Sequence, residues 1–378
     1  MLVPKLRFPE FTDPWEQRKV SDLFKITRGY VLAATLTQPQ KTDITPYPVY
    51  SSQTKDKGLM GYYKDFLYED AITWTTDGAN AGTVNYRSGK FYCTNVCGVL
   101  LSNKVKANQM IAEALNNVAK GYVSYVGNPK LMNNVMADIV IQIPTQAEER
   151  EQLSAFFANL DNLITLLQCE LDALKKLKKA AMQKFFSQEV RFKRENGTDY
   201  PEWEEKILQD VSYYITTTGT GVKSVYVSTE NMQKGCAGVC FDCNDDIAVK
   251  GIQYVPDDIL ISNIRPYLKK AWKADRKGIC STDVLCIRGT SEISSDFLYT
   301  LLSSDSFFEY VVQGVKGTKM PRGDKKHIME MPIFIPCTEE QQKIADFLST
   351  YDEAISYAKQ ELEHWKLLKK GLLQQMFV

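Results

Sequence analysis

The chain has 378 residues, 46 basic and 46 acidic side chains, and a formal net charge of zero. At roughly 150 residues per domain, this length predicts two or three domains, each with its own core. The composition is ordinary for a globular protein, and the zero net charge excludes a strongly basic, histone-like binder while still permitting local basic surfaces. The only histidines are His327 and His364, too few for a histidine-rich metal site.

The cysteines and the apolar segments indicate where the protein works. The chain has nine cysteines, and it shows neither a secretory leader nor an apolar run of about 18 residues. We therefore expect a cytoplasmic protein with reduced thiols. Cys236, Cys240 and Cys243 lie close together, but their spacing lacks a second CxxC pair, so we expect no bound metal.

Short strands and helices are predicted within residues 12–143 and 200–335, where short apolar runs alternate with polar loops. This pattern is typical of α+β domains rich in short strands. Strands are predicted at Ala71–Trp74, Val96–Leu101, Val222–Val227, Ile259–Ser262 and Val284–Arg288, and helical segments at Gln109–Ala119 and Phe297–Gln313.

A much longer helix is predicted after Pro144 and again after Pro336. In both stretches apolar residues recur in alternating steps of four and three, the spacing of a coiled-coil seam. Roughly 40 residues at about 1.5 Å each would make a rod of about 60 Å. The predicted seam consists of Leu153, Phe157, Leu160, Ile164, Leu167, Leu171 and Leu174, and of Ile344, Leu348, Tyr351, Ile355, Ala358, Leu362 and Trp365.

Charge favours an antiparallel arrangement of these two helices. Each begins with glutamates, at Glu148-Glu149 and at Glu339-Glu340, and each ends with lysines. This distribution suits the helix dipole, and antiparallel pairing brings the acidic start of one helix to the basic end of the other. Two separate amphipathic core helices are the alternative, which the matched seams disfavour.

The second half of the chain repeats the first. Asp13–Glu16 (DPWE) returns as Pro201–Glu204 (PEWE), and the IxIP sequence before the first long helix returns before the second. Such ordered self-similarity predicts two related units with a pseudo-twofold relation. Leu6–Phe8 precedes Trp15 as Val190–Phe192 precedes Trp203. We therefore expect the N-terminal segment to pack at the end of the second helix, with a free arm as the alternative.

Polar, aromatic and basic loops supply candidate binding residues. Lysine and arginine suit phosphate groups, and neighbouring Thr, Asn or Gln side chains suit base edges. A merely solvated basic loop is the alternative. The candidates are Arg28, Tyr30, Ser52, Gln53, Thr76, Asn80, Asn85 and Arg87 in the first half, and Lys223, Asn263, Arg265, Tyr267, Lys269, Lys316, Thr318, Lys319, Arg322 and Lys325 in the second.

The sequence contains no recognisable catalytic motif. A GxxxxGK[ST] phosphate loop, an NPPY- or DPPY-type tetrapeptide and a glycine-rich FxGxG segment are all absent. Asp77 and Asp283 lie in polar loops and are interpreted as turn formers. A thiol enzyme using Cys93 or Cys97 is a weak alternative, because both histidines lie in the second half. We therefore expect a protein that is not an enzyme.

Over essentially its whole length, the chain resembles the DNA specificity subunit of type I restriction-modification systems. The residues that carry the resemblance are Pro4–Trp15 (PKLRFPEF…W), Tyr200–Glu205 (YPEWEE), the two IP…EE segments and Gly317–Ile328 (GTKMPRGDKKHI). The resemblance implies an α+β fold, with two homologous target-recognition domains separated by a pair of long antiparallel coiled-coil helices. The expected boundaries are 1–144 and 190–336 for these domains, 145–189 for the first long helix with its linker, and 337–378 for the second.

The resemblance also implies a function. Each domain would read one half of a bipartite double-stranded DNA target, and the helix pair would set the gap. Two modification subunits would carry S-adenosylmethionine and methylate adenine at N6, and restriction subunits would use ATP and Mg²⁺, so this chain would bind no cofactor itself. The family has no catalytic residues to transfer. The alternative is a non-catalytic coiled-coil scaffold with two protein-binding domains.

Overall fold

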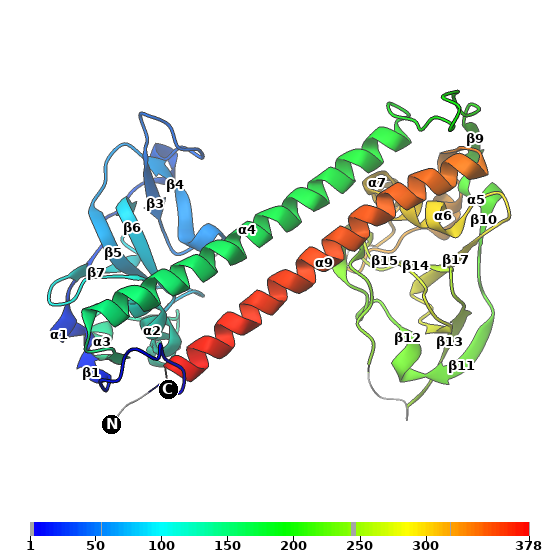
Figure 1. The fold of residues 1–378 in the computed structure, drawn as a ribbon. Coiled ribbons are helices and arrows are strands. Elements are labelled where there is room, and N and C mark those ends of the chain that lie inside the picture. The colour runs from blue at the N-terminus through cyan, green and yellow to red at the C-terminus, as the bar shows by residue number, and fades with distance from the viewer. Residues whose placement is uncertain (1–3, 54, 243–246, 318, 378) are drawn as a thin grey trace. The chain divides into compact units, whose positions relative to one another are not determined.

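The computed structural model describes residues 4–53, 55–242, 247–317 and 319–377 (Figure 1). Contacts between residues divide the chain into two compact units. Unit 1 comprises Met1–Cys169 with Gln360–Val378, and unit 2 comprises Glu170–Lys359. The long helices α4 (Ala147–Phe186) and α9 (Thr338–Met376) therefore each contribute one segment to each unit.

Unit 1 is built on a six-stranded sheet in the order β2-β7-β5-β6-β3-β4. Neighbouring strands are antiparallel, except for the parallel pair β3 and β6. A separate antiparallel pair is formed by β1 (Glu16–Lys19) and β8 (Val140–Ile143). The sheet strands are β2 (Phe24–Arg28), β3 (Tyr47–Tyr50), β4 (Leu59–Tyr63), β5 (Tyr68–Thr75), β6 (Val84–Cys93) and β7 (Cys97–Ser102). The helices are α1 (Val20–Leu23), α2 (Gln109–Ala119) and α3 (Asn133–Asp138), with 3₁₀ turns at Ala34–Leu36, Lys55–Gly58 and Lys120–Tyr122.

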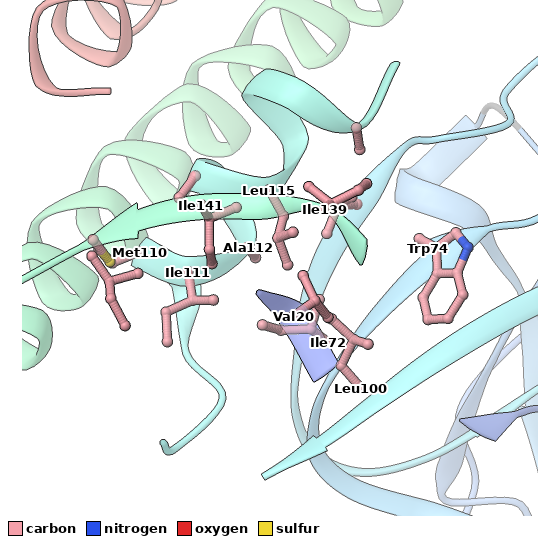
Figure 2. Packing of buried hydrophobic residues seen from close by; sticks show 14 of the residues in the cluster. Val20, Ile72, Trp74, Leu100, Met110, Ile111, Ala112, Leu115, Ile139 and Ile141 are labelled. Atoms are coloured by element: carbon pink, nitrogen blue, oxygen red, sulfur yellow. The ribbon is translucent and has the colours of Figure 1, made fainter. Parts of the chain in front are cut away.

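The main core of unit 1 lies on one face of this sheet (Figure 2). Side chains alternate along a strand, so Ile72 and Trp74 of β5 join this core with Leu100 of β7. The Trp74 ring occupies the space above Gly98, where an added Cβ would lie 2.1 Å from a ring carbon. Glycine at this position is therefore required for the tryptophan to pack.

Helix α2 covers that core face, and its bounds are the predicted ones. The side chain of Asn108 accepts a hydrogen bond from the Ile111 N–H and so caps the helix. Met110, Ile111 and Leu115 are fully buried against the sheet (Figure 2). Full burial of each such side chain contributes about 1.5–3 kcal/mol.

Unit 2 contains two four-stranded sheets, in the orders β10-β17-β14-β15 and β11-β13-β16-β12, and the pair β9 and β18. Its strands are β9 (Glu204–Ile207), β10 (Ser212–Tyr214), β11 (Thr218–Val222), β12 (Tyr226–Val227), β13 (Ala248–Tyr254), β14 (Ile259–Ser262), β15 (Ala271–Lys273), β16 (Gly278–Cys280), β17 (Val284–Gly289) and β18 (Pro332–Ile335). Its helices are α5 (Leu208–Val211), α6 (Ser295–Leu302), α7 (Asp305–Gln313) and α8 (Lys325–Met329), with 3₁₀ turns at Lys223–Val225, Lys234–Cys236 and Pro266–Leu268.

Two predictions within unit 2 are wrong in detail. The single strand expected at Val222–Val227 is instead the end of β11, a 3₁₀ turn and the short β12. The helical segment expected at Phe297–Gln313 is two helices, α6 and α7. The break has a local cause, because the Ser304 side chain accepts a hydrogen bond from the Phe307 N–H and starts a new helix.

The internal repeat is confirmed strand by strand. Glu16 of β1 lies opposite Ile143 of β8, and Glu204 of β9 lies opposite Ile335 of β18. In the larger sheets, β5 lies between β7 and β6, and β14 lies between β17 and β15. Both units therefore contain the same set of paired strands. We call these shared strands the frame of each unit: β1 with β8 and β7-β5-β6 in unit 1, and β9 with β18 and β17-β14-β15 in unit 2.

The N-terminal segment packs at the end of α9, as expected (Figure 1). The Lys5 N–H donates to the carbonyl of Gln375 at 3.0 Å, and the ring of Trp15 lies 5.7 Å from that of Phe377. In unit 2 the segment after α4 behaves in the same way, since the ring of Phe192 stacks on the ring of Phe185 in α4 at 5.2 Å.

The segments of α4 and α9 run antiparallel within unit 1. Phe157 of α4 contacts Phe377 with ring centroids 6.2 Å apart, and Asp161 binds the Lys369 ammonium at 2.6 Å. The residue with the higher number in α4 therefore pairs with the one that has the lower number at the end of the chain, which defines an antiparallel arrangement.

Unit 2 shows the same antiparallel contacts at the other ends of these helices. Lys178 binds Asp352 at 2.5 Å, and the rings of Phe185 and Phe347 lie 5.6 Å apart. All the predicted seam residues in both helices are buried or half-buried, which confirms the apolar stripe.

The charge prediction needs one correction. The helix-to-helix ion pairs involve Asp161 and Asp352, both well inside their helices. The glutamates of the first turns, Glu149 and Glu340, are completely buried and are bound by arginines from outside the helices instead.

Candidate nucleic-acid interface

A buried carboxylate fixes the start of each long helix to its unit. In unit 1 the Arg7 guanidinium donates to both oxygens of Glu149 at 2.6 and 2.7 Å, and the Trp15 indole N–H donates to the same carboxylate at 3.1 Å. Glu149 has no solvent-exposed surface. A bidentate arginine and an indole donor together satisfy a charge that would otherwise be costly to bury.

Unit 2 repeats this arrangement with Arg191, Trp203 and Glu340. The guanidinium lies 3.2 and 2.9 Å from the two carboxylate oxygens, and the indole N–H donates at 3.0 Å. The hydrogen bond to Glu340 raises the pKa of Arg191. We call each set a clamp. Trp15 and Trp203 directly precede β1 and β9, so each clamp fixes the start of a long helix to the first strand of its unit.

The structure brings together two basic stretches of unit 2 that are far apart in sequence. Lys316 and Arg322 pair through two backbone hydrogen bonds of 2.9 and 3.0 Å, which closes a hairpin. This hairpin docks on the segment after β14, because Arg265 N donates to Pro321 O at 2.8 Å and Gly323 N donates to Asn263 O at 3.2 Å. Candidate residues from both stretches therefore form one surface.

Ion pairs neutralise part of this unit 2 surface. Arg322 binds Asp283 at 2.9 Å, and Lys316 forms an ion pair with Asp324. Among the described residues, Arg265 and Lys319 have no ion-pair partner, and both side chains are exposed. Tyr267 is also exposed, at 56%. Arg265 holds a left-handed backbone with φ of 51°, a strained state that is typical of functional loops.

Other candidates of unit 2 have partners of their own. Lys325 lies over the ring of Tyr214 at 5.9 Å, and Lys223 binds Asp242 at 2.8 Å. Lys269 binds Asp305 and lines a separate cavity of about 780 Å³ beside α4 and α7. The candidate Thr318 lies outside the described residues.

Asn263 occupies the junction beneath the hairpin. Its side chain is 8% exposed, and its Oδ1 is buried with no hydrogen-bond partner among the described residues. An added Cβ on Gly323 would lie 2.9 Å from that oxygen. Asn263 therefore supports the loop from within rather than from the outer surface.

A matching hairpin exists in unit 1, and sequence reasoning missed it. Ser124 and Lys130 pair through two backbone hydrogen bonds of 2.9 Å, and Gly78 N donates to Pro129 O at 2.9 Å. Leu131 N donates to Thr76 O at 2.9 Å, as Gly323 N does to Asn263 O. The bond pattern repeats that of unit 2, so Ser124–Lys130 corresponds to Lys316–Arg322.

The unit 1 hairpin presents different chemistry from its counterpart. Tyr125 is 70% exposed and Val126 is 93% exposed, while Lys130 lies 3.8 Å from Asp77. The sequence signal was weak because the segment contains one lysine and no arginine. The feature that could have identified this hairpin is the pair Tyr125 and Val126, an aromatic and an apolar residue directly before Gly127 in a polar turn.

Four of the eight candidates of unit 1 line a cavity of about 260 Å³. Gln53, Asn80, Asn85 and Arg87 line it, and the Asn80 side chain donates to the carbonyl of Ser52 at 2.9 Å. That bond ties the loop after β3 to the loop after β5. The cavity therefore joins residues from β6 and from two loops that the sequence alone did not connect.

The remaining candidates of unit 1 divide by exposure. Arg28 and Tyr30 are exposed at the end of β2, and Tyr30 is 62% exposed. Thr76 is buried, and its hydroxyl donates to Asp77 at 2.7 Å. Arg87 is also buried, at 7% exposure, so its side chain does not stand on the outer surface.

The two thiols considered as nucleophiles, Cys93 and Cys97, have the character of core residues. Cys93 and Cys97 are buried, and burial raises the pKa of Cys97 to about 11 and that of Cys93 further. Such thiols are poor nucleophiles. Among the described residues, no cluster of His, Cys, Asp or Glu is placed to hold a metal ion, and Cys243 lies outside that part of the chain. In the same part of the chain, no helix combines the length and the apolar character needed to span a bilayer.

Comparison with known proteins assigns the family. Residues 12–176 and 193–364 each match the model of the type I restriction modification DNA specificity domain. The chain belongs to this family and is therefore a non-catalytic DNA-recognition component.

Relatives cover almost the whole chain. The type I restriction enzyme MjaVIII specificity subunit of Methanocaldococcus jannaschii is 24% identical over 97% of this chain and 92% of its own length. The crystal structure of a type I restriction-modification S subunit from M. genitalium matches with a TM-score of 0.68 at 16% identity, over 100% of this chain and 99% of that one. A chain from a structural study of complex assembly and conformational transition of the type I R-M system matches with a TM-score of 0.54 at 13% identity. The match covers 97% of this chain and 99% of that chain. The structural matches agree with the fold described above.

Proposed function

We propose that this protein directs a type I restriction-modification complex to a bipartite DNA target, with unit 1 reading one half and unit 2 the other. The observation that carries the proposal is the pair of matched hairpins, Ser124–Lys130 and Lys316–Arg322, each docked on its frame by the same backbone bonds. Equivalent scaffolds with different exposed side chains suit two different half-sites. Joining two short readers raises specificity through effective concentration.

In the second hairpin, Lys319 supplies positive charge for DNA phosphates, and Arg265 and Tyr267 stand on the neighbouring loop. Arg322 joins them by exchanging its ion pair with Asp283 for a phosphate. In the first hairpin, Tyr125 and Val126 offer an apolar and hydrogen-bonding edge for base contacts in a groove. Phosphate contacts fix the register on the duplex, and the base contacts select the sequence.

The proposal assigns the gap between the half-sites to α4 and α9. Each helix is continuous and contributes to both units, so a change in helix length alters the spacing of the two readers. Insertion of seven residues after Leu167 and after Leu362 keeps the alternating seam and adds about 10 Å, or about three base pairs, to the gap. The same insertion in one helix alone serves as the control, because it breaks the pairing.

The chemistry belongs to partners. We propose two modification subunits that bind S-adenosylmethionine and methylate adenine at N6, and restriction subunits that use ATP and Mg²⁺. The target adenine leaves the base stack for methylation, so the specificity subunit holds the duplex while the partner flips the base. The proposal implies a cytoplasmic protein.

The test is a genome-wide map of N6-methyladenine with this gene present and with it deleted. We expect one split motif with a fixed gap to lose methylation on deletion. A map that does not change, in cells where a methyltransferase subunit co-purifies with this chain, would contradict the proposal. Failure of any methyltransferase subunit to co-purify would instead favour the scaffold alternative.

A further inference from the structure

The cavity of unit 1 has an unusual charge balance. It lies on the sheet face opposite the main core, where Thr73, Asn85 and Arg87 project from β5 and β6. Among the described residues, its lining contains Arg87 and Lys57 and no carboxylate, and the rest is mostly polar. The side-chain donors in it include Gln53, Asn80 and Asn85.

Arg87 is held in place by neutral groups. Its Nε donates to the Thr73 hydroxyl at 3.1 Å, its Nη2 donates to the carbonyl of Lys57 at 2.6 Å, and its Cζ lies 3.7 Å from the centre of the Tyr50 ring. These two bonds use two of the five N–H donors of a guanidinium. Burial lowers the pKa of Arg87, yet arginine stays protonated in proteins. In the part of the chain that the structure describes, the positive charge of Arg87 is therefore buried without an anion.

The wall beside Arg87 is built at a conformational cost. Asp56 and Lys57 have left-handed φ values of 49° and 51°, and Gly58 has φ of 91°. A Cβ on Gly58 would lie 2.6 Å from the carbonyl oxygen of Ser51. This strained turn presents the Lys57 carbonyl to Arg87 and brings Lys57 to the lining, with its ammonium 3.4 Å from Asp161. Strain of this kind is found mainly at binding sites.

We propose that this cavity binds a phosphate group, with Arg87 as its main ligand and Asn85, Asn80 and Gln53 as further donors. A phosphate supplies the missing anion and accepts several hydrogen bonds at once. The cavity volume of about 260 Å³ leaves room for the group and bound water. Two sources share this chemistry, a phosphate of the DNA backbone and free inorganic phosphate. The inference rests on the proposed function only for the first source.

The corresponding face of unit 2 offers no such site. The central strand pairs match, because Ile72 opposite Tyr86 corresponds to Ile259 opposite Lys273. By this register Thr73, Asn85 and Arg87 correspond to Leu260, Trp272 and Ala274, which pack in an apolar cluster. The phosphate site is therefore specific to unit 1.

The first experiment measures thermal unfolding of the full chain in sodium phosphate and in sodium chloride at equal ionic strength. We expect phosphate at tens of millimolar to raise the midpoint by a few degrees, because it binds only the folded state. Arg87→Met loses this specific shift. Lys90→Met, an exposed lysine on the same strand, keeps it and reports the general salting effect of phosphate. An equal shift in all three proteins overturns the inference.

Arg87 is buried, so its variant needs a second line of test. Asn85→Ala and Lys57→Met change the lining without removing the bonds that Arg87 makes to Thr73 and to the Lys57 carbonyl. If Arg87→Met fails to fold, a phosphate shift that both of these variants retain in full overturns the inference. A shift that falls at least twofold in both supports it.

DNA binding by the assembled complex separates the two sources. If a DNA phosphate occupies the cavity, Arg87→Met reduces the slope of log affinity against log salt by about one. An unchanged slope together with a lost phosphate shift identifies free phosphate. If the complex methylates a split motif but Arg87→Met changes neither the phosphate shift nor the salt slope, this inference alone is overturned. If the Arg87-dependent phosphate shift is present but no methylated split motif is found, the proposed function alone is overturned.

Discussion

The two units share their frame and differ in the face that the frame presents. In both, an arginine and a tryptophan bind a buried glutamate at the start of a long helix. In unit 1 the second face of the sheet is polar and hollow around Arg87, whereas in unit 2 an apolar cluster with residues from β12, β13 and β16 fills the equivalent space. A buried ionic clamp and paired strands tolerate little change, so divergence is confined to loops and to one sheet face.

The largest effect is expected from breaking a clamp. Glu149→Gln leaves the Arg7 guanidinium without its counterion in a buried site, which costs about 3–5 kcal/mol. Glu340→Gln costs less, because the Arg191 side chain is 19% exposed while that of Arg7 is 8% exposed. Urea unfolding of the full chain measures both, with the exposed Glu148→Gln as the control. Equal losses in all three variants would contradict the clamp assignment.

The helix contacts offer a second comparison between the units. Lys369 lies 2.6 Å from both Glu113 and Asp161, and all three side chains are mostly buried. Burial lowers the pKa of Lys369, but the two carboxylates outweigh it and the pKa is raised. This contribution to stability is therefore present at neutral pH and is lost only as the pH rises through the folded-state value, above 10.5.

We expect Lys369→Met to destabilise unit 1 by about 2–3 kcal/mol, because it leaves two buried carboxylates together. Lys178→Met removes a pair whose Asp352 is 52% exposed, so the loss in unit 2 is below about 1 kcal/mol. Unfolding free energies at pH 7 check both. A larger loss for Lys178→Met would reverse the predicted order.

Substitutions in the two hairpins, Ser124–Lys130 and Lys316–Arg322, test whether the two units contact DNA through different chemistry. If the proposed function is right, Lys319→Ala and Arg322→Ala each remove a phosphate contact, so we expect affinity to fall on all sequences and the salt slope to fall by about one. On the same proposal, Tyr125→Ala removes a base contact, and we expect it to lower affinity roughly tenfold, mainly for the half-site assigned to unit 1.

Binding of the complex to targets with one half-site altered measures these effects. The loss caused by Tyr125→Ala should disappear when the half-site of unit 1 is already mutated. Val140→Ala, an exposed apolar residue of β8 outside the hairpin, is the control and should leave binding unchanged. A uniform loss for Tyr125→Ala on every target would remove its role in base reading.

The smallest effect concerns Asp305 at the start of α7. Hydrogen bonds from Lys179 and Lys269 lower the pKa of Asp305, so its ionised form stabilises the fold. That contribution is fully present above the unfolded value of 3.8 and is lost as the pH falls through the lower folded value. Asp305→Asn should cost about 0.5–1 kcal/mol at pH 7 and less at pH 3. Urea unfolding at both values tests this, with the exposed Glu309→Gln as the control.

The frame was predictable from the sequence because it follows from periodicity and repetition. The 4-3 spacing identified both long helices. The repeat placed an arginine and a tryptophan at matching positions in each half, but the sequence analysis did not predict that they bind Glu149 and Glu340. The sequence analysis did not recognise Ser304 as a helix-capping residue. Ser304 starts a new helix and so divides the helix expected at Phe297–Gln313 into two. Periodicity indicates which face of a helix or strand is buried. It does not indicate which side chain from a distant part of the sequence packs against that face.

The candidate site was less predictable. The basic stretch around Lys319 was recognised by composition, whereas the equivalent Ser124–Lys130 has almost no charge and was found only through its backbone bonds. Arg87 was chosen as a surface contact, but strands β5 and β6 place it inside a cavity. Its environment depends on Tyr50 and the Lys57 turn, which lie far from it in sequence.

The division of the chain also sets an order of events during synthesis. Unit 2 is continuous, from Glu170 to Lys359, whereas unit 1 requires Gln360–Val378 in addition to the first 169 residues. Met376 and Phe377 belong to the main core of unit 1. Although its first residues leave the ribosome earliest, unit 1 waits for the last ones, so the half of the protein that is translated first is the half that completes its folding last.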